Sequence, residues 1–161
     1  MKLEKAIFAC GCFWGAQYQF EHAKGVVRST VGYIGGHKEH PAYEEVKAHT
    51  TGHAEATLVE FDAEQTSFTE LCKLFFEIHD PAQTVGHVPD IGPQYRSEIF
   101  YLNDKQKEEA EAVIALLREK GYEVNTKLTP ATTFWEGEEY HQHYYDKTGG
   151  EPYCHIRVKK F

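Results

Sequence analysis

The segment at residues 10–15, Cys-Gly-Cys-Phe-Trp-Gly, most restricts how this chain folds, because it separates two different local patterns. Residues 5–9 before it form a short apolar run, which predicts a buried strand. Residues 16–25 after it are typical of a helix that ends at a glycine cap. Cys12 is therefore predicted at a strand-to-helix turn, where unpaired backbone N–H groups and the helix dipole stabilise a thiolate. Such a position lowers the pKa of a cysteine from about 8.5 to roughly 3.5–7.5.

This segment has a structural and a functional interpretation. A single cysteine is most often a buried structural residue. The glycines beside Cys12 favour a functional thiol, since glycine lets a ligand approach the backbone closely. Phe13 and Trp14 either pack in the core from the first helical turn or form an apolar surface beside the sulfur.

The rest of the chain predicts alternating strands and helices joined by two long loops, at 37–52 and 80–96. Ser67 and Glu70 have the capping-box pattern and open a helix, and Cys72 on its apolar stripe is predicted to pack in the core. In chain order the predicted elements are strand 5–9, helix 16–25, strands 26–36 and 53–61, helix 67–79, strand 97–102, helix 104–120 and strand 122–128.

The core order of strand, helix, strand, strand, helix, strand predicts the α+β class. It is typical of a ferredoxin-like split βαβ fold, here a two-layer core with long loops and an irregular C-terminal tail. A chain of 161 residues without repeats or linkers is expected to form a single catalytic domain over residues 1–161. We expect the core over about residues 3–145 and the tail over residues 146–161.

Charge and hydropathy argue against two classes of partner. The net charge of −8 argues against nucleic acid, which requires clustered lysines and arginines. No apolar run approaches the roughly 20 residues of a membrane span, so we expect no membrane partner and a cytoplasmic protein. Lys2 and Lys5 before an apolar run imitate a short signal peptide, but Glu4 interrupts them and residues 13–15 are no cleavage site.

Cysteine and histidine spacing does not predict a metal centre. The four cysteines are Cys10, Cys12, Cys72 and Cys154. They lack the spacing of zinc ligands and should be thiols in a reducing compartment. His49 and His53 are four residues apart, but residues 50–52 oppose a helix between them. We therefore expect no metal and no cofactor.

The motif Gly-Cys-Phe-Trp-Gly at the first strand–helix junction resembles the signature of the A-type peptide methionine sulfoxide reductases. The resemblance covers about residues 8–145 and implies thiol-dependent reduction of methionine S-sulfoxide, free or protein-bound, to methionine. It implies oxidised proteins or peptides and free methionine sulfoxide as substrates and thioredoxin as the reductant, and we expect a monomer. Further stretches that share the family's pattern are Gly-His-Ala-Glu at 52–55, Ile-His-Asp-Pro at 78–81, Gln-Tyr-Arg-Ser at 94–97 and Glu-Tyr-His-Gln at 139–142.

Reduction of a sulfoxide by a thiol needs a nucleophilic thiolate, a proton donor for the oxygen and a dry slot for the methyl group. Cys12 is the candidate nucleophile, and Phe13 and Trp14 are the candidate slot. The resemblance gives the role of proton donor to Glu55, where burial beside aromatic rings would raise the pKa of the carboxyl. Taken alone, a glutamate at the start of a strand is usually solvated.

The resemblance also assigns roles to three loop residues. Tyr43 and Tyr95 match tyrosines that donate hydrogen bonds to the sulfoxide oxygen, which suits a phenol because it stays neutral at pH 7. Asp90 matches an acidic residue that helps to hold the substrate. As isolated residues, each of the three is more often an ordinary loop residue.

A second cysteine is expected to complete the reaction. After oxygen transfer Cys12 is a sulfenic acid, which condenses with a nearby thiol to form a disulfide. The resemblance implies Cys154, in the C-terminal tail, as this resolving cysteine. Cys10 departs from the family pattern, and both a packing role and an accessory thiol stay open for it. His141 matches a family motif near the active site without an assigned chemical role.

Two other functions use similar residues. A thiol peroxidase also needs a reactive cysteine but no aromatic slot, so Phe13 and Trp14 argue against it. A non-enzymatic redox sensor or binding module would form a disulfide without multiple turnovers.

Overall fold

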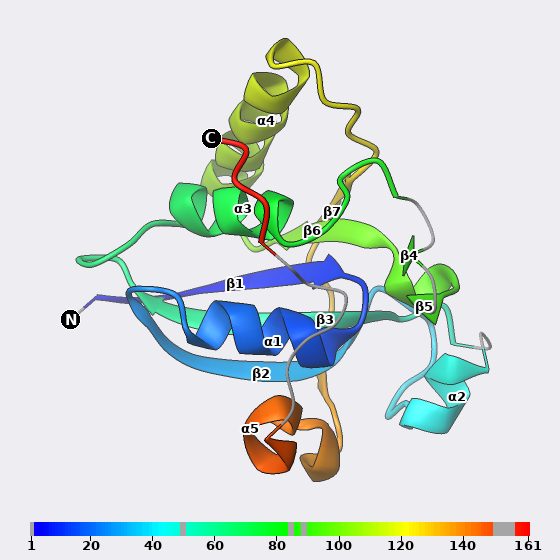
Figure 1. Ribbon diagram of the computed structural model, residues 1–161. Coiled ribbons are helices and arrows are strands. Elements are labelled where there is room, and N and C mark those ends of the chain that lie inside the picture. Colours follow the sequence, from blue (N-terminus) through cyan, green and yellow to red (C-terminus); the bar gives the residue numbers. More distant parts are fainter. Residues whose placement is uncertain (1, 49–50, 84–85, 88–89, 150–156) are drawn as a thin grey trace.

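The computed structural model describes residues 2–48, 51–83, 86–87, 90–149 and 157–161, with the backbone alone at residues 86, 87, 90, 91 and 93 (Figure 1). It has a mixed α/β fold. The strands and helices of the core are β1 (Leu3–Cys10), α1 (Phe13–Glu21), β2 (Val26–Ile34), β3 (Ala54–Asp62), α3 (Phe68–Glu77), β6 (Ser97–Tyr101), α4 (Asp104–Glu119) and β7 (Lys127–Pro130). Shorter elements are α2 (Tyr43–Lys47), β4 (Gly86–His87), β5 (Asp90–Ile91), the 3₁₀ turn η1 (Pro93–Tyr95), β8 (Trp135–Glu136), the 3₁₀ turn η2 (Glu139–His141) and α5 (Tyr144–Thr148).

The described strands form a mixed six-stranded sheet in the order β7-β6-β1-β3-β2-β8, and β4 and β5 form a separate hairpin. β1 is antiparallel to both of its neighbours, so Ile7 lies opposite Leu58 of β3 and opposite Phe100 of β6. β2 is antiparallel to β3 and β8, whereas β6 and β7 are parallel.

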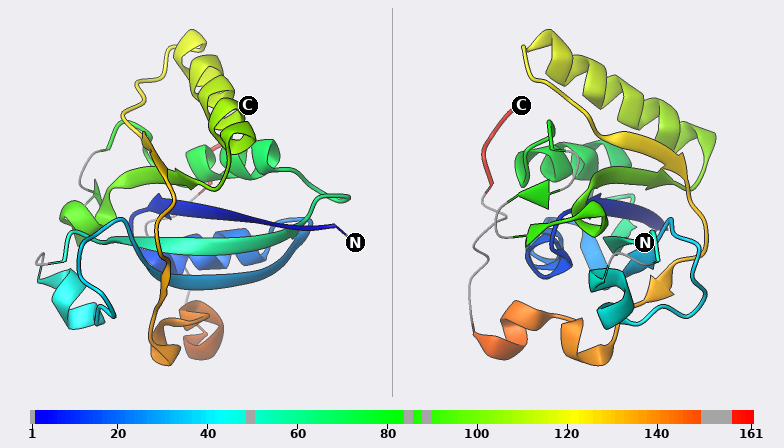
Figure 2. Two further views of the ribbon diagram at one scale, coloured as in Figure 1. Left: turned by 180° about the vertical axis from the view of Figure 1, so that it is seen from behind. Right: turned by 90° about the vertical axis from the view of Figure 1, so that its right-hand side faces the viewer.

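The two faces of the sheet are covered differently because side chains alternate along each strand. On one face, Phe8 of β1 stacks on Phe20 of α1 at 5.0 Å and on Phe75 of α3 at 5.3 Å. α1, α3 and α4 all contribute to this apolar cluster. On the other face, Ala131 and Phe134 cover a smaller cluster, and the chain between β7 and β8 crosses the sheet there (Figure 2, left).

Local sequence signals predicted several features correctly. The Ser67 hydroxyl accepts a hydrogen bond from the Glu70 N–H at 3.1 Å and caps α3, as the capping-box pattern predicted. Cys72 is fully buried in the core cluster, and burial raises the pKa of its thiol well above the ordinary value. None of the described helices is long and apolar enough to cross a membrane.

The bounds of α1 and β7 differ most from the prediction. α1 begins at Phe13 and ends at Glu21, and Gly25 instead forms the turn into β2 with a φ of 83°. The last strand was predicted at residues 122–128, but in the structure β7 begins only at Lys127 and ends at Pro130. The preceding residues are not in the sheet because they bond elsewhere: the Asn125 N–H donates to the Pro81 carbonyl at 2.8 Å.

The C-terminal residues 157–161 return to the end of α3 (Figure 1). The Val158 N–H donates to the Glu77 carbonyl oxygen at 2.7 Å, and Arg157 Nη2 lies 2.8 Å from Glu77 Oε1. The Lys160 N–H donates to Glu77 Oε2 at 2.9 Å. Residues on both sides of 150–156 are therefore fixed to the core, through α5 and through Glu77.

Candidate functional site

Cys12 lies at the turn between β1 and α1, as the sequence predicted. β1 ends at Cys10, Gly11 has a φ of 100°, and Cys12 is the N-cap residue of α1. A positive φ favours glycine, so Gly11 allows the chain to leave the sheet and enter the helix within two residues. Cys12 is 7% exposed, and its own side chain makes no capping hydrogen bond to the helix. The sulfur atom thus belongs to the residue at the positive end of a nine-residue helix.

Glu55 brings a buried carboxyl group to the same helix end. It lies on β3, is 1% exposed, and its Oε1 accepts a hydrogen bond from the Phe13 N–H at 3.3 Å. Phe13 is the residue directly after Cys12. The pairing of β3 between β1 and β2 carries Glu55 to this turn. The carboxyl and the thiol predicted to cooperate are therefore brought to adjacent positions.

Tyr43 belongs to the same electrostatic environment. It is the first residue of α2, a short helix inside the first predicted long loop. Burial raises the pKa of the Tyr43 hydroxyl well above its ordinary value, and negative charge on Glu55 and on Cys12 raises it further. The Tyr43 hydroxyl is therefore a neutral hydrogen-bond donor at pH 7.

Aromatic rings enclose the residues that follow Cys12. The Phe13 ring lies 5.7 Å from the ring of Tyr33, 6.4 Å from that of Tyr43 and 5.2 Å from that of His141. The Trp14 ring stacks on Tyr144 with the ring centres 3.8 Å apart. Its indole Nε1–H donates to Nδ1 of His141 at 2.9 Å. Phe13 thus packs in a buried cluster, at 1% exposure, and Trp14 lies partly buried against it, with both orientations set by neighbours far along the chain.

Glu138 positions two of these aromatic residues. Its Oε1 accepts a hydrogen bond from the Tyr33 hydroxyl at 2.7 Å, and its Oε2 accepts one from the Tyr43 N–H at 2.9 Å. Burial raises the pKa of Glu138, but these hydrogen bonds outweigh it, so the pKa lies below its ordinary value. The carboxylate form of Glu138 therefore stabilises the arrangement of β2, α2 and the segment before η2.

The substitution Glu138→Gln tests this role. The amide of glutamine has one acceptor oxygen, whereas the carboxylate accepts from both the Tyr33 hydroxyl and the Tyr43 N–H. One of these hydrogen bonds is therefore lost, and we expect the free energy of unfolding at pH 7 to fall by about 1–3 kcal/mol. A folded-state pKa below the unfolded value means that this stabilisation is present above about pH 4.3 and is lost as the pH falls through the lowered pKa. Urea denaturation of both proteins should thus give a difference at pH 7 that shrinks in acid. The matched control is Glu139→Gln at a side chain that is 89% exposed, where little change is expected. A difference in the free energy of unfolding that does not change with pH would contradict a stabilising role of the Glu138 carboxylate.

The structure describes the remaining three predicted site residues to different extents. Tyr95 is 9% exposed and lies in η1, which contacts β3, the strand of Glu55. Asp90 lies in β5 of the second long loop, and its side chain is outside the described residues. Cys154 also lies outside the described residues. The structure therefore brings together Cys12, Glu55, Tyr43, Phe13 and Trp14.

The sequence prediction missed three residues around the site, namely Tyr33, Glu138 and Tyr144, and it placed His141 near the site without a role. The motif Glu-Tyr-His-Gln pointed to His141 but suggested no contact for it. Glu138 had no local signal, since its partners lie 95 and 105 residues earlier in the chain.

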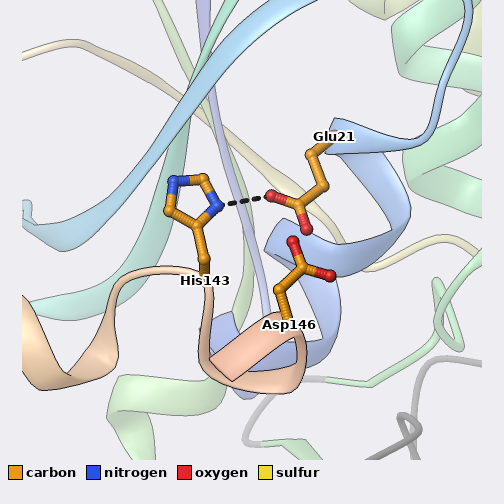
Figure 3. A group of neighbouring side chains, drawn as sticks. All are labelled: Glu21, His143 and Asp146. Carbon is orange, nitrogen blue, oxygen red and sulfur yellow. Dashed lines mark hydrogen bonds and ion pairs between the residues drawn. The ribbon is translucent and has the colours of Figure 1, made fainter. Parts of the chain in front are cut away.

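A second polar cluster joins α5 to the C-terminal end of α1 (Figure 3). Glu21, His143 and Asp146 offer imidazole and carboxylate atoms within 4.8 Å of one another, with His143 Nδ1 2.5 Å from Glu21 Oε2. Burial, then a hydrogen bond with Asp146, raises the pKa of Glu21, while His143 lowers it. The cluster lies at the opposite end of α1 from Cys12, roughly 13 Å along the helix axis. It fixes α5 in place, and the neighbouring Tyr144 can therefore stack on Trp14.

A thiol at a helix N-terminus, a buried carboxyl beside it and an aromatic enclosure together define a thiol-based oxidoreductase. Residues 4–161 match the family of peptide methionine sulfoxide reductases. The chain therefore belongs to the peptide methionine sulfoxide reductase family, of the MsrA type, and the resemblance noted in the sequence is confirmed.

The relatives cover nearly the whole chain. MsrA of Acinetobacter baumannii (strain AYE) is 42% identical over 97% of this chain and 90% of its own length. MsrA of Geobacter sulfurreducens is 46% identical over 92% of this chain and 93% of its own length. The crystal structure of reduced Mxr1 from Saccharomyces cerevisiae has a TM-score of 0.88 at 33% identity, covering 97% of this chain and 92% of that one.

Proposed function

We propose that this chain reduces methionine S-sulfoxide, free or in peptides and proteins, to methionine, with Cys12 as the nucleophile and Glu55 as the proton donor. The hydrogen bond from the Phe13 N–H to Glu55 Oε1 carries the proposal, because it holds a buried carboxyl beside the cysteine at the start of α1. An apolar, buried setting disfavours a charged carboxyl group, so it favours the protonated form that a proton donor requires.

The first step transfers one oxygen atom. The Cys12 thiolate attacks the sulfoxide, the S–O bond of the substrate breaks, and the Glu55 proton neutralises the oxygen. The products are methionine, a Cys12 sulfenic acid and a Glu55 carboxylate, so atoms and charge balance. The sulfenic acid then condenses with a second thiol, releasing water and forming a disulfide.

The aromatic residues bind the sulfoxide. Phe13 and Trp14 provide the apolar faces for the methyl group and sulfur, which pack well on aromatic rings. Tyr43 is a neutral donor for the sulfoxide oxygen, since burial raises the pKa of its hydroxyl and keeps it protonated. Tyr95, from η1 beside β3, is the second proposed donor, and Asp90 is proposed to help to hold the substrate through hydrogen bonds.

We assign the resolving thiol to Cys154 and the reductant to thioredoxin. A disulfide needs an external dithiol for the next turnover, and the yeast relative Mxr1 forms a complex with Trx2. Residues 1–161 are proposed to act as one cytoplasmic, monomeric catalytic domain whose tail carries Cys154. The reaction uses side chains of the protein alone, without a metal or cofactor.

We describe the core as ferredoxin-like, with the split βαβ order. The argument for this description is the strand order β6-β1-β3-β2, with each adjacent pair antiparallel and with α1 and α3 on one face. The strands β7 and β8 then extend the core sheet at its two edges.

Turnover of separated sulfoxide epimers tests the function. With a dithiol reductant, we expect multiple turnovers of N-acetyl-methionine S-sulfoxide methylamide, slow or no consumption of the R epimer, and no comparable peroxide reduction. After one turnover without reductant, mass spectrometry should find a disulfide between Cys12 and Cys154. Preference for peroxide would indicate a thiol peroxidase, and a disulfide without multiple turnovers would indicate a redox sensor. Pairing of Cys12 with another cysteine would contradict only the assignment of Cys154.

A further inference from the structure

His141 lies at the centre of the aromatic enclosure beside Cys12. Its side chain is buried, at 1% exposure, although it comes from the short 3₁₀ turn η2. Its ring centre lies 4.2 Å from that of Tyr43, 5.2 Å from that of Phe13 and 5.6 Å from that of Trp14. These are the three aromatic residues proposed to bind the sulfoxide. The imidazole therefore lies among the side chains proposed to bind the sulfoxide.

One hydrogen bond determines which ring nitrogen of His141 carries a proton. The indole N–H of Trp14 is only a donor, and it points to Nδ1 of His141 at 2.9 Å. Nδ1 must therefore be the acceptor, which leaves the proton on Nε2. Burial lowers the pKa of His141, and the carboxylates of Glu138 and Glu44 oppose this only in part, so the ring is neutral at pH 7.

The Nε2–H group of His141 is a hydrogen-bond donor without an acceptor in the part of the chain that the structure describes. Nε2 is buried and has no hydrogen-bond partner among the described residues. A buried donor without a partner is costly, so such groups usually face a ligand or an ordered water molecule. Phe13 has no polar side-chain atom and the indole N–H of Trp14 is only a donor, so neither of these two ring neighbours can accept the hydrogen bond.

We propose that His141 is a substrate-binding residue whose Nε2–H donates a hydrogen bond to the sulfoxide oxygen of the bound substrate. This inference rests on the proposed function. The side chain of methionine sulfoxide has a single hydrogen-bond acceptor, its oxygen. The polar backbone of the substrate does not suit an aromatic enclosure, so the group that enters is this side chain. His141 thus has two tasks: Nδ1 orients Trp14, and Nε2–H distinguishes the sulfoxide from the methionine product, which lacks the oxygen.

Two substitutions separate these tasks. In His141→Asn the short amide places its oxygen near the position of Nδ1, where it can accept from Trp14, but it leaves no donor at the position of Nε2. In His141→Gln the longer side chain places an amide N–H near the position of Nε2. Both are made in the Cys12→Ser background, so that binding is measured without turnover.

The probes are N-acetyl-methionine S-sulfoxide methylamide and N-acetyl-methionine methylamide, titrated by calorimetry. His141→Asn should weaken binding of the sulfoxide by about tenfold, the loss expected for one hydrogen bond, and leave binding of the thioether within about twofold. His141→Gln should restore part of the sulfoxide affinity. Equal weakening of both ligands would show a packing role alone, and no weakening of either would show that Nε2–H is not used; each result overturns the proposal.

A measurement without any change at His141 covers the case in which the variants fold poorly. In the Cys12→Ser protein, the Hε2 proton of His141 observed by NMR should shift on addition of the sulfoxide and not on addition of the thioether. Binding of the sulfoxide with an unmoved Hε2 signal overturns the role of His141 and leaves the proposed function intact. Failure of the wild-type chain to reduce the sulfoxide overturns both.

Discussion

Replacement of Cys12 by serine should lower kcat/KM for methionine S-sulfoxide by at least about 10⁴-fold, to the background of the assay, because a hydroxyl at this position is not ionised and cannot accept the oxygen atom. The fold should be retained, since the serine occupies the same N-cap position before α1. The measurement is methionine formation with excess dithiol. Labelling of the oxidised protein by a sulfenic-acid reagent should be lost at residue 12 at the same time.

Cys72→Ala is the matched control for Cys12→Ser. Cys72 is also a buried thiol, but it packs in the core from α3. Its loss should reduce stability through the cavity that it leaves and change kcat/KM by less than about threefold. Substantial turnover by the Cys12→Ser protein would refute the assignment of the nucleophile.

Replacement of Glu55 by glutamine should lower kcat by about 10²- to 10⁴-fold, the contribution usual for general acid catalysis. The amide has the shape of the carboxyl and still accepts the hydrogen bond from the Phe13 N–H, but it has no acidic proton to transfer. Binding and folding should therefore change little, so KM and the thermal midpoint should stay close to those of the wild-type protein. The loss should be smaller at low pH, where solvent supplies protons.

Glu60→Gln tests whether this effect belongs to position 55. Glu60 lies on the same strand β3, but it faces Lys5 and Arg28 across neighbouring strands. Its substitution makes the same change from a carboxyl to an amide group and should leave kcat within about twofold. If Glu55→Gln instead retains kcat within about threefold, another group donates the proton.

Two predictions that depended only on neighbouring residues agreed with the structure. The Cys12 turn needs only Gly11 and the change from strand to helix pattern, and the cap of α3 needs only Ser67 and Glu70. α2 was missed because its N-cap is Ala42, which has no capping side chain. Instead the Glu45 side chain accepts from the Ala42 N–H at 3.0 Å.

The sites that could not be predicted depend on pairs far apart in the chain. Trp14 and His141 are 127 residues apart, and no pattern within a window of either residue records their hydrogen bond. The start of β7 also depends on a distant strand. β7 pairs in parallel with β6, and it begins at Lys127, the first residue that lies opposite β6, at Glu98. The cluster of Glu21, His143 and Asp146 forms only when α5 returns to α1 (Figure 3).

By itself the sequence determined a cysteine at a strand-to-helix turn with two aromatic residues after it, since backbone conformation at glycine and helix initiation act over a few residues. The groups that surround that cysteine come from distant segments, so they depend on the tertiary structure. Glu55 reaches the Phe13 N–H across 42 residues because β3 is inserted between β1 and β2, and His141 arrives after the chain has crossed the opposite face of the sheet. Sheet order and side-chain packing over long sequence separations set these contacts, and they have no local signature.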